Sequence, residues 1–488
     1  MKEIKGLKNI IKSFETRHVK YGGYAALITL AVITALILAN LIVGQFTIQL
    51  DMTENKVFSL SEQTIQVLDQ INTPVNIYGI WQPGQENNDI MEVLGIYLAR
   101  NKNLKYQALD PDRNPGKMQN YDKEKKGIKR GSVIVEGIKG FRVIPPEDMY
   151  DISNSRGQSS VTGIAVEKRL TSAFLFAGTG ESPVVYEITG HQESLMSTLG
   201  LKDFIEQENF ILKQLNLIQS NIPADASALI IVSPLSDISR SEADKLLDYL
   251  EQGGRLLIMA DYRLQEHSMF NEVLASYGLS FDYGIVMEND PVYTMGEFFM
   301  EIPSLKNHDI TAPLLQKNGT VVLPFAMGIS ENETKRRSVN ITPLLVTSEK
   351  SWLRSDIYNN SMSKIVSDRS GPVTIAAAVT DSGYIQEDEK QTRIVAIGSS
   401  TVMSTPYGDF SIFFQQLIPG NNQDLFMNSL TWLEDRPETL SVRSKSVYVH
   451  PMRLNGLKIV IFSGFFVIII PLAFFVAGLV SWLKRRHL

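Results

Sequence analysis

Cysteine is absent from the 488 residues of this chain, which removes several kinds of chemistry at once. A chain without thiols has no disulfide framework, no thiolate metal site and no cysteine nucleophile. The phosphate-cradling pattern Gly-x-x-x-x-Gly-Lys-Ser/Thr is also missing, so ATP hydrolysis would have to come from another subunit. Gly-x-Ser-x-Gly is missing as well, which argues against a hydrolase with a nucleophile elbow. We therefore expect no enzymatic activity and no cofactor.

Histidine and net positive charge are scarce in the body of the chain. The six histidines are scattered without a pair at i, i+4, so a catalytic zinc site is not supported and no metal is expected. The whole chain carries −6, while residues 1–23 and 457–488 carry +4 each, which leaves −14 for the middle. Because an acidic body repels phosphates, nucleic acid is not expected as a partner.

Two long uncharged apolar runs are present, at 24–43 and 459–480. A helix of twenty residues is about 30 Å long, which matches the hydrocarbon thickness of a bilayer. We therefore predict two transmembrane helices, the second with Pro471 as a tolerated kink. Small residues recur at the spacing that lets such helices pack closely. They are Ala31, Ala35 and Ala39 in the first helix, and Ala473, Ala477 and Ser481 in the second.

The charges around the first run predict its orientation. Basic residues dominate before it, whereas residues 44–55 contain no Lys or Arg, so the N-terminus is expected in the cytoplasm. Two spans return the C-terminus to the same side and leave about 410 residues outside the cytoplasm. A cleavable signal peptide is the alternative, but the run is longer than the usual apolar region of roughly 7 to 15 residues and lacks a cleavage site after it.

The region after the first span begins as an α/β lobe. Ser59 and Glu62 have the spacing of a capping box, which predicts a helix that stops at Pro74. Strands are predicted at 75–81 and 105–109, a helix at 90–101, a hairpin at 132–136 and 141–144, and a helix at 161–176.

A second lobe shows continuous apolar strands that alternate with amphipathic helices, the pattern of a parallel sheet covered on both faces. Strands are predicted at 184–189, 228–233, 255–260, 320–324, 372–379 and 392–397, with helices at 197–208 and 424–433. Another helix is expected to begin with a capping box of Ser239 and Glu242. Residues 287–370 are rich in turns and are interpreted as an insertion or long loops.

Four polar residues follow strands of this second lobe: His191, Glu193, Ser233 and Asp261. Open α/β sheets bind ligands at the carboxyl ends of their strands, so these four are the candidate ligand-binding residues. His191 and Glu193 could serve as an acid/base or ligand pair. A polar loop that fixes the turn is the favoured interpretation, because no nucleophile or third ligand is evident.

Asp110, Asp112 and Asn114 have the alternate spacing of a calcium loop. Pro115 stands where such a loop needs glycine, and Tyr121 stands where it needs a bidentate glutamate. A turn stiffened by prolines is the favoured role.

An ordered series of motifs resembles the GldG-like family of auxiliary components of ABC-2-type transport systems, linked to bacterial gliding motility. The motifs are DMTEN at 51–55, FSLS at 58–61, PV at 74–75, DPDRNP at 110–115 and YEITGHQE at 186–193. The resemblance implies a bacterial plasma-membrane subunit that works with a separate ABC ATPase and an ABC-2-type permease. It also implies that the second lobe is similar to class I glutamine amidotransferases, whose catalytic cysteine this chain lacks.

The expected architecture is therefore α/β, with two transmembrane helices flanking two extracytoplasmic lobes, the second a parallel-sheet, Rossmann-like domain. The expected parts are a basic cytoplasmic N-terminus (1–23), a span (24–43), lobe 1 (44–180), lobe 2 (181–440), a linker (441–458), a span (459–480) and a cytoplasmic C-terminus (481–488). The predicted function is a non-catalytic accessory subunit whose lobes bind or gate the transported substrate. The alternatives are an anchored module that binds a carbohydrate or envelope ligand, and, weakest, a hydrolase using His191 and Glu193.

Overall fold

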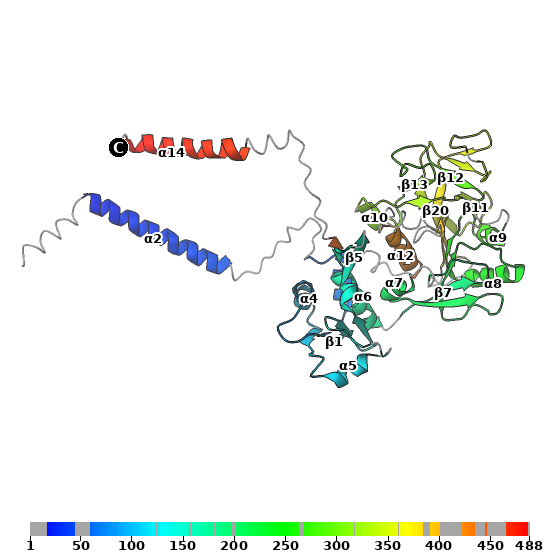
Figure 1. Cartoon of the computed structure of the whole chain (residues 1–488), viewed down its shortest axis with the longest axis horizontal. Helices are drawn as coiled ribbons and strands as arrows, with labels where there is room; N and C mark the ends of the chain where they lie inside the picture. The colour runs from blue at the N-terminus through cyan, green and yellow to red at the C-terminus, as the bar shows by residue number, and fades with distance from the viewer. Residues whose placement is uncertain are drawn as a thin grey trace, which may run out of the picture. The chain divides into compact units, whose positions relative to one another are not determined.

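The structure is a computed structural model (Figure 1). It describes residues 17–43, 59–122, 125, 127–155, 158–179, 182–196, 201–262, 268–316, 318–359, 361–383, 391–400, 421–434, 445–446 and 465–486. Backbone packing divides the chain into two compact units, residues 1–56 and 57–488.

The described part of the first unit is one helix, α2 (Arg17–Val43), whose apolar side chains are largely exposed. The second unit ends in a π-helical turn (Phe465–Ile469) that continues into α14 (Ile470–Arg486). No helix among the described residues is both long enough and apolar enough to cross a membrane. The two spans, and the helix packing through their small residues, stay predictions.

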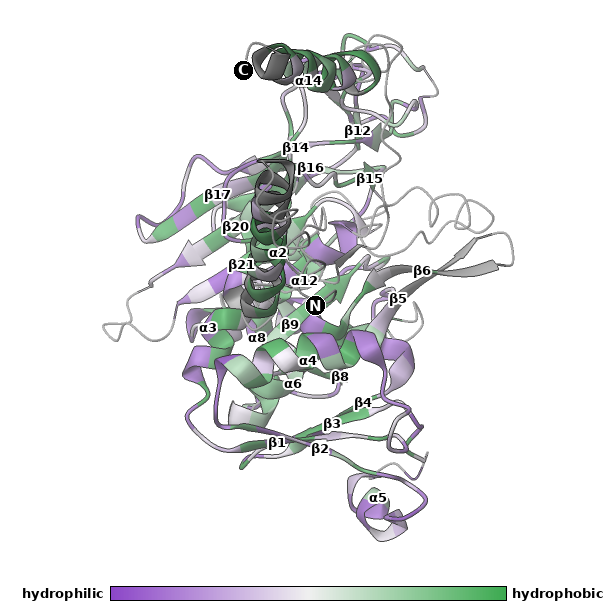
Figure 2. Ribbon diagram, turned by 90° about the vertical axis from the view of Figure 1, so that its left-hand side faces the viewer, coloured by the Kyte–Doolittle hydropathy of each residue, from purple (hydrophilic) through white to green (hydrophobic). Residues whose placement is uncertain are grey.

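A four-stranded sheet, in the order β2-β1-β3-β4, forms lobe 1. Its strands are β1 (Val75–Gly79), β2 (Leu104–Ala108), β3 (Val133–Glu136) and β4 (Phe141–Ile144). β1 and β2 run parallel through the crossover helix α4 (Asn88–Arg100), whereas β3 and β4 form the predicted antiparallel hairpin. Figure 2 shows α4 and α6 (Val166–Thr179) along one face of this sheet. The rings of Tyr97 on α4 and Phe174 on α6 pack against each other, with their centroids 5.4 Å apart.

The first helix of lobe 1, α3 (Glu62–Gln70), is capped by Ser61 and not by Ser59 as predicted. The Thr64 amide donates to Ser61 Oγ at 3.3 Å, and the Ser61 amide donates to Glu167 Oε1 at 2.6 Å. The predicted capping box is wrong because Glu62 is the first residue of the helix. The carboxylate of Glu167, on α6, accepts the hydrogen bond from the N-cap amide that the prediction assigned to Glu62.

The helix predicted at 161–176 begins later because a strand precedes it. β6 (Gln158–Ile164) forms an antiparallel hairpin with β5 (Tyr150–Ser155). β22 (Lys445–Ser446) adds to the other side of β6. The chain therefore returns to lobe 1 after it has built lobe 2.

The segment with calcium-loop spacing is a turn in lobe 1. The Asp112 amide donates to Asp110 Oδ1 at 3.0 Å, and Arg130 Nη2 lies 2.7 Å from Asp112 Oδ2. Pro115 then opens the short helix α5 (Pro115–Tyr121). Arg130 thus pairs with Asp112, one of the residues at the spacing of calcium ligands, which agrees with the interpretation of this segment as a turn.

Lobe 2 is built on a ten-stranded mixed sheet. Five strands run parallel in the order β8-β7-β9-β10-β21. They are β7 (Val184–Thr189), β8 (Ile211–Asn216), β9 (Ala226–Val232), β10 (Arg255–Met259) and β21 (Thr392–Ile397). Antiparallel strands extend the sheet beyond β21: β20 (Thr374–Asp381), β16 (Gly328–Glu331), β11 (Leu279–Asp282), β17 (Val339–Val346) and β14 (Ser304–Leu305).

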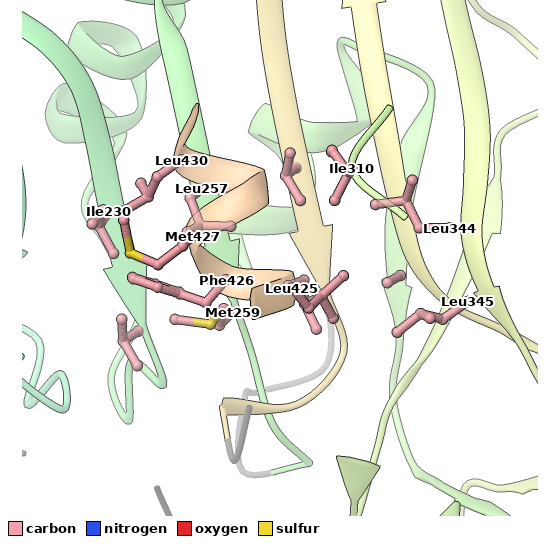
Figure 3. Close-up of a cluster of buried hydrophobic side chains, with 14 of the residues drawn as sticks. Ile230, Leu257, Met259, Ile310, Leu344, Leu345, Leu425, Phe426, Met427 and Leu430 are labelled. Carbon is pink, nitrogen blue, oxygen red and sulfur yellow. The ribbon is translucent and has the colours of Figure 1, made fainter. Parts of the chain in front are cut away.

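Successive residues of the buried strands face two different hydrophobic cores, as the pleat requires. On one face, helices α7 (Lys202–Gln207) and α12 (Asn421–Leu433) cover the sheet. Figure 3 shows Phe426, Met427 and Leu430 of α12 against Ile230 and Leu257. On the other face, α8 (Arg240–Glu251) and α9 (Met269–Ala275) pack against Leu229 and Ile231.

Part of the predicted insertion, 287–370, belongs to the main sheet, because β14, β16 and β17 lie within it. The strand predicted at 320–324 shrinks to β15 (Leu323–Pro324), which pairs with β13 (Met300–Glu301) in a separate small sheet. Another small sheet joins β12 (Ile285–Met287), β18 (Trp352–Arg354) and β19 (Arg369–Ser370). The predicted main-sheet position of 320–324 is therefore wrong.

Polar contacts join α6 of lobe 1 to the segment after α7 of lobe 2. Arg169 donates to Glu208 Oε1 at 3.0 Å and to Gln207 Oε1 at 2.7 Å, and Lys168 Nζ lies 2.8 Å from the same Glu208 oxygen. Asn209 Nδ2 donates to the carbonyl of Ser172 at 2.6 Å. These groups are mostly shielded from solvent, which strengthens the contact over a fully exposed ion pair.

Candidate functional site

The candidate residues lie where the strand order of lobe 2 reverses. The chain leaves β7 for β8 on one side and then crosses to β9 on the other, so the crevice between β7 and β9 is a topological switch point. His191 follows β7, and Ser233 follows β9. Their two loops are joined by backbone hydrogen bonds: Ser194 N donates to Val232 O at 2.9 Å and Leu235 N donates to His191 O at 3.0 Å.

His191 is buried between two glutamates. Its Nδ1 lies 3.1 Å from Glu193 Oε1, and its Nε2 lies 3.2 Å from Glu242 Oε1. Only the first contact is a hydrogen bond, since Glu242 Oε1 has no hydrogen-bond partner among the described residues. A carboxylate only accepts, so the ring nitrogen Nδ1 is the donor to Glu193. The ring of Phe270 meets the imidazole edge-on at 6.4 Å and closes another side of it.

Glu193 and Glu242 also have backbone roles. The His191 amide donates to Glu193 Oε2 at 2.7 Å, which closes a turn in which Gln192 has a φ of 60°. Glu242 completes the predicted capping box with Ser239 at the start of α8. Burial alone would raise the pKa of Glu242, but hydrogen bonds from Ser239 and the nearby His191 hold that pKa below its ordinary value.

Ser233 and Asp261 form the second pair of the predicted set. Ser233 Oγ donates to Asp261 Oδ2 at 2.6 Å, and Ser400 Oγ donates to the same oxygen at 3.0 Å. All three residues are buried. Ser233 has a φ of 48°, a left-handed conformation that costs a non-glycine residue energy and is often found at functional sites.

The structure therefore brings the four predicted residues to one edge of the sheet, as two separate hydrogen-bonded pairs. Sequence reasoning missed Glu242 and Ser400 as members of these clusters. Both carried a usable signal, because Glu242 lies in the first turn of the helix after β9, and Ser400 follows the predicted strand 392–397. Parallel strands end at the same edge, so such residues converge there.

The arrangement offers little for catalysis. The hydroxyl of Ser233 is hydrogen-bonded to a carboxylate, whereas His191 is held between Glu193 and Glu242 in the other pair. Within the described ranges, no group of three or more His, Asp or Glu residues is arranged to hold a metal ion. At this edge, buried polar and charged groups join the loops that follow the strands to one another.

Comparison with known families relates most of lobe 2 to a transport function. The sequence profile of a family described as an ABC-type uncharacterized transport system matches residues 182–429, about half of the chain. The chain belongs to this family of auxiliary ABC-transport proteins. A second profile, for a domain of unknown function, matches residues 54–145 of lobe 1. No curated protein matches the chain.

Two solved structures are similar to parts of the chain at low identity. The N-terminal domain titled mmIFT52 shares 16% identity over 51% of this chain and 96% of its own, with a TM-score of 0.35. The exo-beta-1,4-mannosidase Op5Man5 from Opitutaceae bacterium strain TAV5 shares 11% identity over 70% of this chain and 48% of its own, with a TM-score of 0.26. Neither likeness is close enough to support an argument about function.

Proposed function

We propose that this auxiliary protein is a non-catalytic subunit that docks on a separate ABC ATPase and an ABC-2-type permease, in the manner of the GldG-like family. Family membership over residues 182–429 is the observation that carries the proposal. The missing P-loop pattern supports it, because the chain would depend on another subunit for ATP hydrolysis. The lobes would lie outside the cytoplasm of a bacterial cell, where they bind or gate the transported substrate.

The path of the chain supports an anchored arrangement. The chain enters lobe 1 at α3, builds lobe 2, and returns to lobe 1 through β22 before the second apolar run. Both predicted spans would therefore connect through lobe 1. In this arrangement both anchors would attach to lobe 1, and the contact of Arg169 with Glu208 would join lobe 2 to lobe 1.

The experiment is affinity purification of the tagged full chain from its own membranes in mild detergent, with mass spectrometry of the proteins recovered. We expect stoichiometric recovery of an ATPase with a P-loop and of a multi-span permease. Recovery of this chain alone in several detergents would contradict the proposal.

A second candidate function is an envelope or carbohydrate ligand site at the switch point between β7 and β9. The strained Ser233 and the buried Asp261 that accepts two hydroxyls favour it. Thermal-shift measurements with cell-wall fragments test this candidate, since a ligand that binds the folded state stabilises it by mass action. A saturable rise in Tm that is lost in Asp261→Asn would support it, and no shift with any fragment would remove it.

A further inference from the structure

The loop between β18 and β19, residues 355–367 with residue 360 outside the described part, is closed by a buried ion pair. Arg354 and Asp368 meet through Nη2 and Oδ2 at 2.7 Å and through Nε and Oδ1 at 3.2 Å. Their side chains are 3% and 1% exposed. Arg354 also donates to the carbonyls of Ser361 and Ser363, and the Ile365 amide donates to Asp368 at 2.8 Å. The interior of this loop is therefore filled by charged and polar groups.

Three apolar side chains of the same loop are exposed to solvent, whereas Ile357 and Ile365 are half-buried. Val366 is 107% exposed, Tyr358 is 85% exposed and Met362 is 51% exposed. Val366 and Tyr358 are the two most exposed large hydrophobic residues among the described residues of lobe 2. A single exposed apolar residue is ordinary, but three on one short loop form an interaction surface or an aggregation hazard. A loop with a rigid base can present them without a large ordering cost on binding.

Three ion pairs surround the loop. Lys350 pairs with Asp290 at 2.9 Å, Arg369 pairs with Asp282, and Arg354 pairs with Asp368. Within the loop, Asp356 and Lys364 carry one charge of each sign, so the loop carries no net positive charge. A surface that binds anionic lipid headgroups would need a cluster of unpaired cations. A surface without net charge and with a protruding tyrosine suits an uncharged, apolar cleft on a protein, where such residues act as anchors.

We propose that Tyr358, Met362 and Val366 form a docking loop that inserts into an apolar, uncharged cleft on another subunit of the transport assembly. This inference rests on the proposed function and deepens it, because it assigns the docking surface to the segment between β18 and β19. Arg354 and Asp368 are positioning residues, which hold the three apolar side chains outward.

The test compares the tagged full chain with Tyr358→Ser/Val366→Ser, purified from its own membranes at matched expression. The controls are Ile138→Ser in lobe 1 and Ile218→Ser in lobe 2, whose side chains are 69% and 63% exposed. Loss of two anchor residues should weaken association about tenfold or more, so recovery of the ATPase and permease should fall by a similar factor at limiting concentration. The controls should recover both subunits like the unaltered chain.

The outcomes separate the two proposals. If the unaltered chain recovers no ATPase or permease, the proposed function fails. If it recovers both and the double variant recovers them equally well, the docking loop is wrong while the proposed function stands. If the double variant instead loses binding to neutral phosphatidylcholine vesicles or loses a self-associated form, a bilayer or a second copy replaces the protein cleft. Unchanged Tm values in all variants exclude misfolding as the cause.

Discussion

The carboxyl edge of the main sheet and the docking loop both bury charged side chains, but the consequences are opposite. At the edge, His191 lies between Glu193 and Glu242 and joins the loops after β7 to the start of α8. In the docking loop, Arg354 and Asp368 occupy the interior and leave Tyr358 and Val366 in solvent. The first arrangement joins the loops at an edge of the sheet, and the second leaves apolar side chains of a loop exposed to solvent. Buried charge therefore does not by itself mark a binding site.

The largest effect is expected from Asp368→Ala, which leaves Arg354 buried without its partner. Removing one member of a buried ion pair costs about 3 kcal/mol or more. We expect either a loss of that size in urea unfolding of the full chain in detergent, or new protease cleavage within 355–367 if only the loop opens. Asp69→Ala, which removes a partner from the exposed pair of Arg100 and Asp69, is the control and should change neither readout. An unchanged midpoint and cleavage pattern for Asp368→Ala would remove the basis of the preorganised loop.

His191→Ala is expected to have the next largest effect, because Glu193 Oε1 would lose its partner on the imidazole and a cavity would open beside Phe270. Removing a buried hydrogen-bonding side chain and its packing costs about 2 to 3 kcal/mol. Urea midpoints of the variant and the unaltered chain measure the effect. An unchanged midpoint would contradict a structural role for His191 at this edge of the sheet.

Glu301 is a buried carboxylate that makes the stability of the folded protein depend on pH. Burial raises its pKa well above the ordinary value, the amides of Glu301 and Ala326 oppose the rise, and the charge of Glu288 adds to it. Neither of its carboxylate oxygens has a partner of good hydrogen-bond geometry among the described residues. The folded state therefore holds this proton more tightly than the unfolded state, and stability falls as pH rises from the unfolded pKa through the folded one.

Glu301→Gln should remove that loss. We expect the variant to be more stable than the unaltered chain at about pH 8, by roughly 1 kcal/mol or more, and close to it at about pH 5. Thermal unfolding of both chains across this range is the measurement. A variant that is less stable at about pH 8 would mean that the carboxylate is ionised and satisfied in the folded protein.

The smallest effect is expected at the start of α3, where Ser61 is the observed N-cap and Ser59 is the predicted one. Ser61→Ala should cost about 1 kcal/mol, the usual value of an N-cap. Ser59→Ala should cost clearly less. Urea unfolding of the two variants compares them directly, and an equal or larger cost for Ser59→Ala would restore the capping box predicted from sequence.

Local patterns carried the predictions that succeeded. The strands at 184–189 and 392–397 were predictable because continuous apolar residues lie between turn residues, and both are found with those bounds. The capping box of Ser239 and Glu242 needs only residues three apart, and it is present. His191, Glu193, Ser233 and Asp261 lie at one edge of the sheet, as the rule about parallel strands expects, while their ligand-binding role stays a prediction.

Features that depend on distant partners could not be predicted. β8 lies at the edge of the main sheet, where several of its side chains are exposed and polar. Its sequence therefore lacks the continuous apolar run that predicts a buried strand. The cap of α3 depends on Glu167, which is 106 residues from Ser61. The docking loop lies in the segment 287–370, which was predicted only as an insertion or long loops, since nothing local shows that Arg354 and Asp368 fill the interior of the loop. The fold class as a whole and the two membrane spans stay predictions.

The most direct test of the accessory-subunit account is cross-linking mass spectrometry of the complex recovered from native membranes. The account predicts cross-links to an ATPase or permease subunit from Lys364, which lies within the docking loop between Met362 and Val366. It predicts few from Lys245, which lies on α8 outside the docking loop. Cross-links that join this chain only to itself, in a preparation that contains both transporter subunits, would contradict the account.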